Sequence, residues 1–490
     1  MKKILALFLL SALILITIIS CGNSSKNETN NPEAIVADPQ NTETTRDPEL
    51  PNIADADYNN RDFLIYYINW SLYKDYYFAD SQNGEIINDA CYDRTALIEE
   101  KLNINITTVP TTEANGGLEQ INKLRACVMA NDDIYDLLLL HNSTMMATFI
   151  ADRLVLNWND IPVIDMSKSY WNQSVSKNLN INGMLPFASN DFILPDVNSI
   201  FFHTQLLDDL NLENPYEIVN DGRWTWDKLI QMASVASADI DGDGVFTAED
   251  RYGFVGEFGW QFGSVPTSCN QYTIKIDSDG KPQLNINTPV MIGLMEKIER
   301  LIKADNISFT WGFSQVTDPN LGGTPPVSFN SGRALFYMVP LSLAKLFREM
   351  DVDFGIIPLP KYNEAQENYI TLNWAGFLSV PLTVQDTELV GKVVELLGYY
   401  NKQIVIPMFY DILLGQKISR DDRSNEMLNI IFKNSVYDLG VVLDSPFYCI
   451  TLNVVNSKNG FASYYTANEN SLQKIIDDYY KAHVEYMEIK

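Results

Sequence analysis

Phe63-Leu64-Ile65-Tyr66-Tyr67 is a compact apolar run, and it starts the alternation that decides the fold of this chain. An apolar run of this length predicts a buried strand. Residues 93–102 then predict a helix, and the alternating residues 104–109 predict a second strand. A further helix is predicted over 118–129 and a further buried strand over 135–140. Strand–helix–strand order of this kind predicts a mainly parallel sheet with helices on both faces, and therefore an α/β fold.

The alternation continues through the rest of the chain. Strands are predicted at 199–202, 334–339 and 354–357, helices at 226–237, 289–304 and 388–401, and a β-hairpin with a Gly-containing turn at 273–287. More than 400 residues follow residue 57, which is enough chain for two or three domains with large cores.

The N-terminus has the pattern of an export signal. Two lysines precede an apolar run over residues 4–19, and Ser20-Cys21 follows it. The segment resembles a bacterial lipoprotein signal, in which Cys21 becomes the lipid-bearing first residue, so residues 1–21 are expected to be a signal peptide. An uncleaved membrane anchor is the alternative, although the apolar run is near the short end of what a spanning helix needs. In either case the rest of the chain is expected to work outside the cytoplasmic membrane, tethered to its extracellular face.

The segment after the signal and the overall charge fit an exported protein. Residues 22–57 are rich in Asn, Asp, Thr and Pro and predict a disordered tether. The chain has 35 basic and 63 acidic residues, a formal charge of −28. Such a surface repels nucleic acid and anionic lipid headgroups, so nucleic acid is not expected as a partner.

Cysteine and histidine spacing argues against a redox or catalytic centre. Cys91, Cys127, Cys269 and Cys449 are too widely spaced for a CxxC redox pair or a zinc ribbon, and both disulfides and free thiols remain open. The three histidines lie far apart, which gives poor support to a histidine metal centre or a Ser-His-Asp triad. The sequence also lacks a P-loop, a nucleophile elbow and a dinucleotide fingerprint, so we expect no enzymatic activity.

The sharpest local signal is the acidic loop over residues 239–250. It places oxygen ligands at positions 1, 3 and 5, a glycine at 6, a backbone carbonyl at 7 and a carboxylate at 12, which is the spacing of an EF-hand-type calcium loop. The expected ligands are Asp239, Asp241, Asp243, the Val245 carbonyl and Asp250. A structural calcium ion is therefore the expected cofactor, and a solvated acidic turn is the alternative.

Aromatic residues occur in polar company along the chain. The sequence contains 8 Trp, 25 Tyr and 23 Phe, and Trp70 and Trp374 each follow an Asn. Sugar rings present an apolar C–H face and a rim of hydroxyls, so their binding sites combine flat aromatics with amides and carboxylates. The pattern favours a sugar ligand, although for any single aromatic residue core packing is the more common role.

Four segments, in this order, carry a resemblance to a known family. They are the strand and following turn at 199–212, the helix start Trp224-Thr225-Trp226-Asp227, the element at 329–336 and the segment at 354–360. Together they resemble the carbohydrate-type (family 1) extracellular solute-binding proteins of bacterial ABC importers. The chain departs from the family at 203–205, where it has His-Thr-Gln in place of the common Tyr-Asn-Lys.

The resemblance implies a two-lobed periplasmic-binding-protein-like fold (type II), with lobes joined by hinge strands and a ligand held between them. Lobe I is expected to comprise 58–187 and 353–398, and lobe II to comprise 188–352 and 399–490, with the acidic loop in lobe II. Ligand-binding residues of the family lie on loops at strand ends. The matching positions are Trp70, His141, Asn142, Asn190, Asp191 and Trp374.

The expected function is therefore solute capture without chemistry. A lipid-anchored, monomeric binding protein would take up a sugar or oligosaccharide and deliver it to an ABC permease in the membrane. Two alternatives remain: an extracellular glycan-acting enzyme (hydrolase or lyase), and a calcium-stabilised surface adhesin.

Overall fold

The computed structural model describes part of the chain. The described residues are 47–70, 76–114, 116–141, 145–257, 259, 261–303, 306–311, 325–343, 353–415, 422–443, 445–457 and 459–489. The chain divides into Met1–Pro48 and Glu49–Lys490, and the second unit is described below. The expected signal peptide, Cys21 and most of the expected tether lie outside the described residues. Within the described part of the chain, no helix has both the length and the apolar character needed to cross a membrane.

The last part of the expected tether is ordered. The backbone N–H of Ala56 donates to the Lys101 carbonyl at 3.0 Å, and the side chain of Ile53 is buried. The Ser169 hydroxyl donates to the Glu49 carboxylate at 2.7 Å. The prediction of a disordered tether is thus wrong for residues 49–57, because an apolar side chain in this polar segment packs on the folded body.

Lobe I is built on a four-stranded sheet, which confirms the strands predicted at its core. Its strand order is β12 (Phe377–Ser379), β3 (Leu137–Leu140), β1 (Arg61–Tyr67) and β2 (Ile104–Pro110). β1 pairs in parallel with β2 and β3, and β12 pairs antiparallel to β3. The main helices of this lobe are α2 (Ile86–Leu102), α3 (Gly117–Ala130), α4 (Met146–Ala151), α5 (Gln173–Asn178) and α12 (Thr387–Tyr400).

Lobe II is built on a five-stranded mixed sheet. Its strand order is β10 (Phe354–Ile357), β4 (Asn198–His203), β9 (Ala334–Pro340), β5 (Tyr252–Glu257) and β8 (Ser308–Trp311). β5 is parallel to β8 and β9, whereas β4 is antiparallel to β9 and β10. Every residue of β4 and of β9 is buried, which explains their continuous apolar sequences: helices cover both faces of the sheet.

Helices surround the lobe II sheet and continue to the C-terminus. They are α6 (Thr204–Asp209), α7 (Pro215–Asn220), α8 (Trp226–Ala236), α9 (Ser264–Ser268), α10 (Pro289–Lys303), α11 (Pro325–Asn330), α14 (Asp422–Lys433), α15 (Leu439–Leu443), α16 (Ser445–Tyr448) and α17 (Ile450–Asn456). The hairpin predicted at 273–287 is present as β6 (Ile274–Ile276) and β7 (Pro282–Leu284). α8 begins where the sequence indicates, since the Thr225 hydroxyl accepts the Lys228 N–H.

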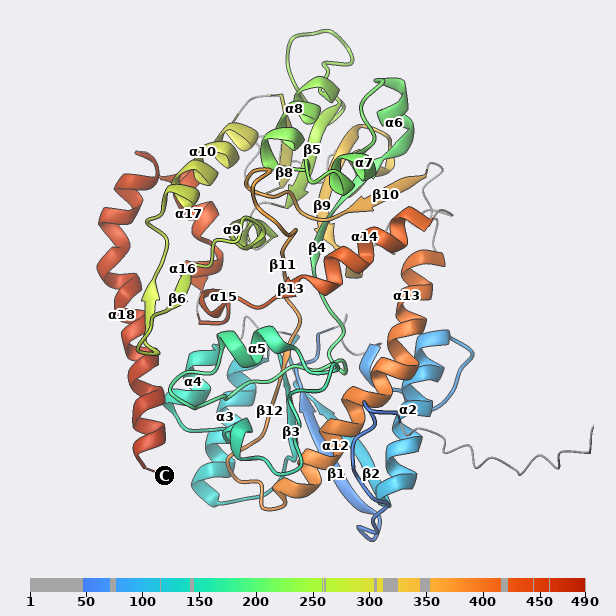
Figure 1. Ribbon diagram of the computed structural model, residues 1–490, viewed down its shortest axis with the longest axis vertical. Coiled ribbons are helices and arrows are strands. Elements are labelled where there is room, and N and C mark those ends of the chain that lie inside the picture. Colours follow the sequence, from blue (N-terminus) through green and yellow to red (C-terminus); the bar gives the residue numbers. More distant parts are fainter. Residues whose placement is uncertain are drawn as a thin grey trace, which may run out of the picture. The chain divides into compact units, whose positions relative to one another are not determined.

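Crossing segments join the two sheets. Val197 pairs with Asn373, and β11 (Thr371–Leu372) pairs in parallel with β13 (Ser435–Val436). Figure 1 shows β11 and β13 between the two sheets, beside the chain that leads into β4 of the lobe II sheet. Segments near residues 197, 373 and 436 therefore pass side by side from one lobe to the other, and the predicted two-lobed α/β fold with hinge strands is confirmed.

The boundary placed at residue 353 needs correction. The sequence analysis assigned 353–398 to lobe I as one piece, but β10 pairs antiparallel with β4 in the lobe II sheet. β12 is the strand of this segment that joins lobe I. The chain thus returns to lobe I through β11, and local sequence patterns do not reveal this because strand order depends on pairing between distant residues.

Two long helical segments extend along both lobes. α12 continues through a π-helical turn at Asn401–Val405 into α13 (Ile406–Gly415) (Figure 1). The C-terminal helix α18 (Gly460–Glu488) contacts lobe II through Gln473, which accepts the Leu284 N–H, and lobe I through Tyr486, whose hydroxyl donates to the Val155 carbonyl at 3.1 Å.

Candidate functional site

The carboxyl ends of β1 and β3 carry two of the side chains expected to bind ligand. Trp70 follows β1 and His141 follows β3, and these strands are parallel neighbours. The two rings stack with centroids 4.9 Å apart and an interplanar angle of 27°. Both side chains are half-buried, and burial lowers the pKa of His141 to about 4, so its ring is neutral at physiological pH. The structure therefore brings these two predicted residues together at one edge of the lobe I sheet.

Asp196 lies at the corresponding edge of the lobe II sheet. It lies in the crossing segment just before β4, and its Oδ1 accepts a hydrogen bond from the Ser342 hydroxyl at 2.8 Å. Ser342 follows the carboxyl end of β9. On the lobe I side, the charge of Asp196 adds to burial in raising the pKa of Tyr77, in the segment after β1. Ser342, which follows a lobe II strand, therefore contacts this carboxylate directly, while the pKa of Tyr77 in lobe I responds to its charge.

The Asp196 carboxyl is half-buried and has hydrogen-bonding capacity left. Burial raises its pKa to about 6, and the hydrogen bond from Ser342 acts in the opposite direction. Among the described residues, Ser342 is the one hydrogen-bond partner of this side chain. A carboxylate, a hydroxyl and a stacked aromatic pair can together accept ligand hydroxyls and cover a ring face. We define Trp70, His141, Asp196 and Ser342 as the strand-end site.

Asp196 and Ser342 are not among the site residues predicted from the sequence. Asp196 lies between Pro195 and Val197 in a segment with other acidic and amide residues, so composition does not distinguish it. A usable signal is its position three residues before the strand predicted at 199–202, where the chain passes from one lobe to the other. Ligands of open α/β sheets bind outside the carboxyl ends of the strands. The predicted residue Asn142 lies outside the described residues.

Asn190 is a structural residue of the first crossing segment. Its side-chain amide donates to the Val394 carbonyl at 3.0 Å, and its Oδ1 accepts the Phe192 N–H at 3.1 Å. The side chain is 2% exposed. Because both ends of the amide are bound inside the protein, Asn190 joins this segment to α12 and stays in the interior.

Asp191 lies at a separate recess between the lobes. The cavity measures about 440 Å³ and is lined by the loop before α5, by α13 and by the segment around β13. Lys402 Nζ lies 3.7 Å from the Asp191 carboxylate. Burial in the recess raises the pKa of Asp191 to about 7, and Lys402 acts in the opposite direction. We call this cavity the Asp191 recess; the strand-end residues are not among those that line it.

Trp374 is packed in the protein interior. Its indole N–H donates to the Ser264 hydroxyl at 2.8 Å, and its ring packs edge-on against Tyr448 with centroids 5.9 Å apart. The side chain is 5% exposed. Trp374 therefore packs the crossing segment near residue 373 against α9, and its side chain lies away from solvent.

The acidic loop gathers three of its five expected ligands. Carboxylate oxygens of Asp239, Asp241 and Asp243 all lie within 4.8 Å of one another. Asp250 is buried, and its two oxygens accept the N–H groups of Ile240 and Thr247 at 2.8 and 2.6 Å. Asp250 therefore closes the loop, while the other three carboxylates form a cluster of the kind that hard cations such as calcium bind.

Comparisons with known proteins identify the fold. No protein-family model and no curated protein matches the chain. Solved structures do match. An ABC substrate-binding protein from Listeria monocytogenes, in complex with cycloalternan, has 12% identity and a TM-score of 0.51, with 88% of this chain and 100% of that chain covered. The chain has the two-lobed fold of ABC solute-binding proteins.

Two further neighbours show the range of ligands that this fold holds. The galacto-N-biose-/lacto-N-biose I-binding protein of an ABC transporter from Bifidobacterium longum, in complex with lacto-N-biose, has 12% identity and a TM-score of 0.52, covering 88% of this chain and 98% of that chain. UgpB from Mycobacterium tuberculosis, in complex with glycerophosphocholine, has 13% identity and a TM-score of 0.53, covering 85% and 98%. At such identities the likeness establishes the fold.

Proposed function

We propose that the protein captures a sugar or oligosaccharide between its lobes and delivers it to an ABC permease. The observation that carries this proposal is the pair of features grouped as the strand-end site: a stacked Trp70–His141 pair at the carboxyl ends of lobe I strands, and Asp196 of the crossing segment, which accepts a hydrogen bond from Ser342 of lobe II. Aromatic faces and a carboxylate are the groups that sugar recognition uses. Solute-binding proteins with the same fold have been solved with cycloalternan and lacto-N-biose.

Capture follows from the position of this site between two lobes. A ligand that contacts Trp70 of lobe I and Ser342 of lobe II has more partners when the lobes are close together, so its binding free energy favours the closed arrangement. The crossing segments near Val197, Asn373 and Val436 would bend to allow this motion. The closed form would then be what the permease recognises. This function needs no covalent step.

A thermal-shift screen of the purified protein against mono- and oligosaccharides tests the proposal. Ligand that binds the folded state alone raises the melting temperature as its free concentration exceeds Kd. One sugar that gives a large and saturable shift, and is recovered unchanged after incubation, is the expected result. Cleavage of that sugar would favour a glycan-acting enzyme, and no shift with any sugar would refute carbohydrate capture.

We also propose that Cys21 carries a lipid that anchors the protein to the outer face of the cell membrane. The support is the sequence: a basic start, an apolar run over residues 4–19, and Ser20 directly before the cysteine. Replacement of Cys21 by Ala should move the protein from the membrane fraction to the soluble fraction. Retention of the Cys21→Ala variant in the membrane would instead favour an uncleaved anchor.

We propose calcium as a structural cofactor of the acidic loop. The support is the EF-hand-like spacing together with the cluster of Asp239, Asp241 and Asp243. Calcium should raise the melting temperature of the wild-type protein and leave that of the Asp239→Asn/Asp243→Asn double variant unchanged. Asp277→Asn, in the turn between β6 and β7, is a matched control that should keep the full calcium response. An equal response in the double variant would remove the loop as the calcium site.

A further inference from the structure

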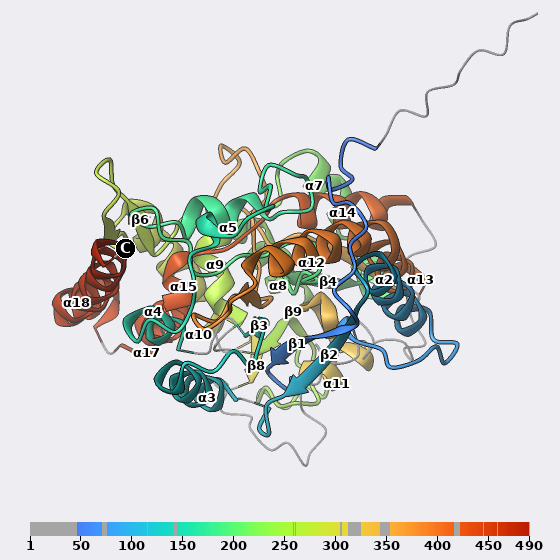
Figure 2. The same ribbon diagram turned by 90° about the horizontal axis from the view of Figure 1, so that it is seen from below.

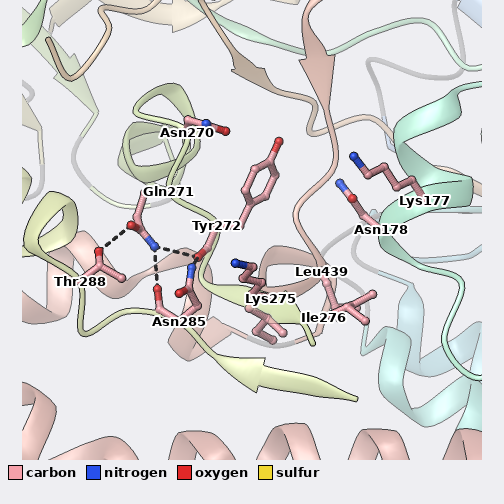
Figure 3. Close-up of a pocket in the computed structure, with 11 residues that line it drawn as sticks. Lys177, Asn178, Asn270, Gln271, Tyr272, Lys275, Ile276, Asn285, Thr288 and Leu439 are labelled. Atoms are coloured by element: carbon pink, nitrogen blue, oxygen red, sulfur yellow. Dashed lines mark hydrogen bonds between the residues drawn. The ribbon is translucent and has the colours of Figure 1, made fainter. Parts of the chain in front are cut away.

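A second recess between the lobes has an unusual charge for this protein. It measures about 410 Å³ and takes one wall from α5 of lobe I, through Lys177 and Asn178. The opposite wall comes from lobe II, through the segment after α9 and the β6–β7 hairpin. Figure 3 shows Lys177 and Asn178 on α5 across the recess from Tyr272. In the view of Figure 2, α5, α9 and β6 lie toward the upper edge, whereas β1, β2 and β8 lie toward the lower edge.

The lining of this recess is basic in a strongly acidic chain. It includes Lys177 and Lys275 and no Asp or Glu, although the whole chain carries a formal charge of −28. Three other recesses formed by described residues each include at least one acidic side chain. Neither Lys177 nor Lys275 forms a salt bridge with any residue that the structure describes. Two ammonium groups from facing lobes thus border one cavity without a counter-charge on its walls.

Hydrogen bonds fix the polar frame of the recess. The Gln271 amide donates to the carbonyls of Tyr272 and Asn285 at 3.1 and 2.6 Å, and the Asn285 amide donates to the Tyr272 carbonyl at 2.9 Å (Figure 3). Asn178 donates one amide hydrogen to the Tyr437 carbonyl at 2.8 Å, which leaves its second hydrogen for a ligand. The backbone that carries Tyr272 is therefore held in place, while Lys177, Lys275 and Asn178 present donors.

One acidic group beside the recess, Asp438, is engaged inside the protein. Asp438 contributes, after burial, to raising the pKa of Tyr272 to about 12. Its carboxylate accepts the N–H groups of Thr273 and Gly440 at 3.1 and 2.9 Å, and burial raises its own pKa to about 6. Both of its oxygens thus have internal donors, and Asp438 forms no salt bridge with Lys177 or Lys275 among the described residues.

We propose that this recess binds a phosphate ester, with the phosphoryl group between Lys177 and Lys275. A phosphate monoester carries a charge of about −1.5 to −2 at neutral pH, which matches two ammonium groups. Lysine acts as a compact point charge toward phosphate, and amide and phenol donors suit ester or sugar hydroxyls. The cavity has room for more than inorganic phosphate. A free sugar phosphate has this charge, and the phosphodiester headgroup of an anionic lipid offers the same kind of phosphoryl oxygens with one negative charge.

Calorimetric titration of the purified protein at low ionic strength tests the site. Glucose 6-phosphate is the probe for a free ester, and vesicles of phosphatidylglycerol are the probe for a headgroup. Wild-type protein should bind one of the two, and added salt should weaken the binding. The Lys177→Gln/Lys275→Gln double variant should bind about tenfold more weakly or worse, because each lysine supplies a charge-assisted contact. Failure of both probes to bind wild-type protein would overturn the proposal.

The control separates the site from general surface charge. Lys123→Gln removes an exposed lysine on α3 that forms no salt bridge with the described residues, so it should leave the affinity unchanged. An equal loss in Lys123→Gln and in the double variant would show nonspecific attraction and overturn the site. Both target lysines are exposed, and an unchanged melting temperature of the double variant would verify its fold. Binding of glucose 6-phosphate through its sugar at the strand-end site would persist in the Lys177→Gln/Lys275→Gln variant, so the double variant distinguishes this recess from carbohydrate capture, and unchanged binding in it would overturn the proposal.

Discussion

The strand ends and the crossing segments both lie between the lobes, yet their polar side chains are in different situations. At the strand ends, Trp70, His141 and Asp196 are half-buried, and Asp196 has one described hydrogen-bond partner. Two other residues of the crossing segments, Asn190 and Trp374, are buried instead, and their polar atoms are bound inside the protein. A position near the lobe boundary is therefore insufficient for a ligand contact. Partial exposure and unused hydrogen-bonding capacity are needed as well.

The largest expected effect concerns the crossing segments. Replacement of Trp374 by Ala removes a buried indole and its hydrogen bond to Ser264, and should lower the free energy of unfolding by about 3–5 kcal/mol. Denaturant unfolding measures the loss. Trp374→Phe keeps most of the packing and should be affected less. If the Trp374→Ala variant were as stable as the wild type but had lost its affinity for sugar, this side chain would belong to the ligand site. The difference between the crossing segments and the strand-end site would then not hold.

The next effect concerns the carboxylate of the strand-end site. Asp196→Ala should weaken the binding of the sugar identified in the thermal screen by about 10- to 100-fold, because hydrogen bonds to a charged group are worth about 1.5–3 kcal/mol. Isothermal titration measures this change. Asp191→Ala is the matched control, since it removes a carboxylate from the other recess, and it should bind sugar as the wild type does. A loss confined to Asp191→Ala would move the ligand to the Asp191 recess.

A smaller effect is expected for the aromatic pair. Trp70→Ala removes one ring of the stack and should weaken sugar binding about tenfold, which corresponds to about 1.4 kcal/mol. The melting temperature should change little, because the side chain is only half-buried. Tyr92→Ala removes an exposed aromatic side chain from α2 and should leave affinity unaltered. Full affinity in Trp70→Ala would exclude the stack from the ligand site.

The pH dependence of sugar affinity distinguishes Asp196 from the other titratable groups near the lobe boundary. The pKa of Asp196 is raised to about 6, so the carboxylate is present above that pH and is lost as pH falls through it. Sugar affinity should be constant above about pH 7 and about tenfold lower near pH 5. His141, with a pKa of about 4, stays neutral in this range, whereas Asp191, with a pKa of about 7, would give an earlier loss.

Two observations would secure the assignment of that pH effect. Asp196→Asn should abolish the dependence, and an unchanged profile in this variant would assign it to another group. Acid unfolding driven by Asp196 cannot cause this drop in sugar affinity, because the folded-state pKa of this group is raised above its ordinary value of 3.8. Protonation of Asp196 therefore favours the folded protein as pH falls.

Local pattern predicted most elements of the fold. The run at 63–67 lies within β1, and the helices predicted at 118–129 and 289–304 differ from α3 and α10 by a residue at their ends. The spacing of apolar residues and the length of each run suffice to predict these elements. Both faces of the sheets are covered, so the buried strands appear in the sequence as apolar runs. The membership of β10 in the lobe II sheet was not predictable in this way, since it depends on pairing with β4, about 150 residues earlier.

The candidate site was predictable in its location but only partly in its residues. Trp70 and His141 follow strands of one parallel sheet, and the rule that ligands lie beyond carboxyl ends of strands places them together. The family resemblance, which selected all of these positions, also selected Asn190 and Trp374, and these two are buried by contacts with α12 and α9. Which polar groups are satisfied internally depends on tertiary packing, and a single sequence does not contain that information in readable form.

The most direct test of the central claim is a crystal structure with the sugar that gives the largest thermal shift. The account predicts electron density for a sugar ring against Trp70 and His141, with a hydroxyl donating to the Asp196 carboxylate and with lobe II closed over it. Density for the sugar in the Asp191 recess, with the strand-end site filled by solvent alone, would contradict it.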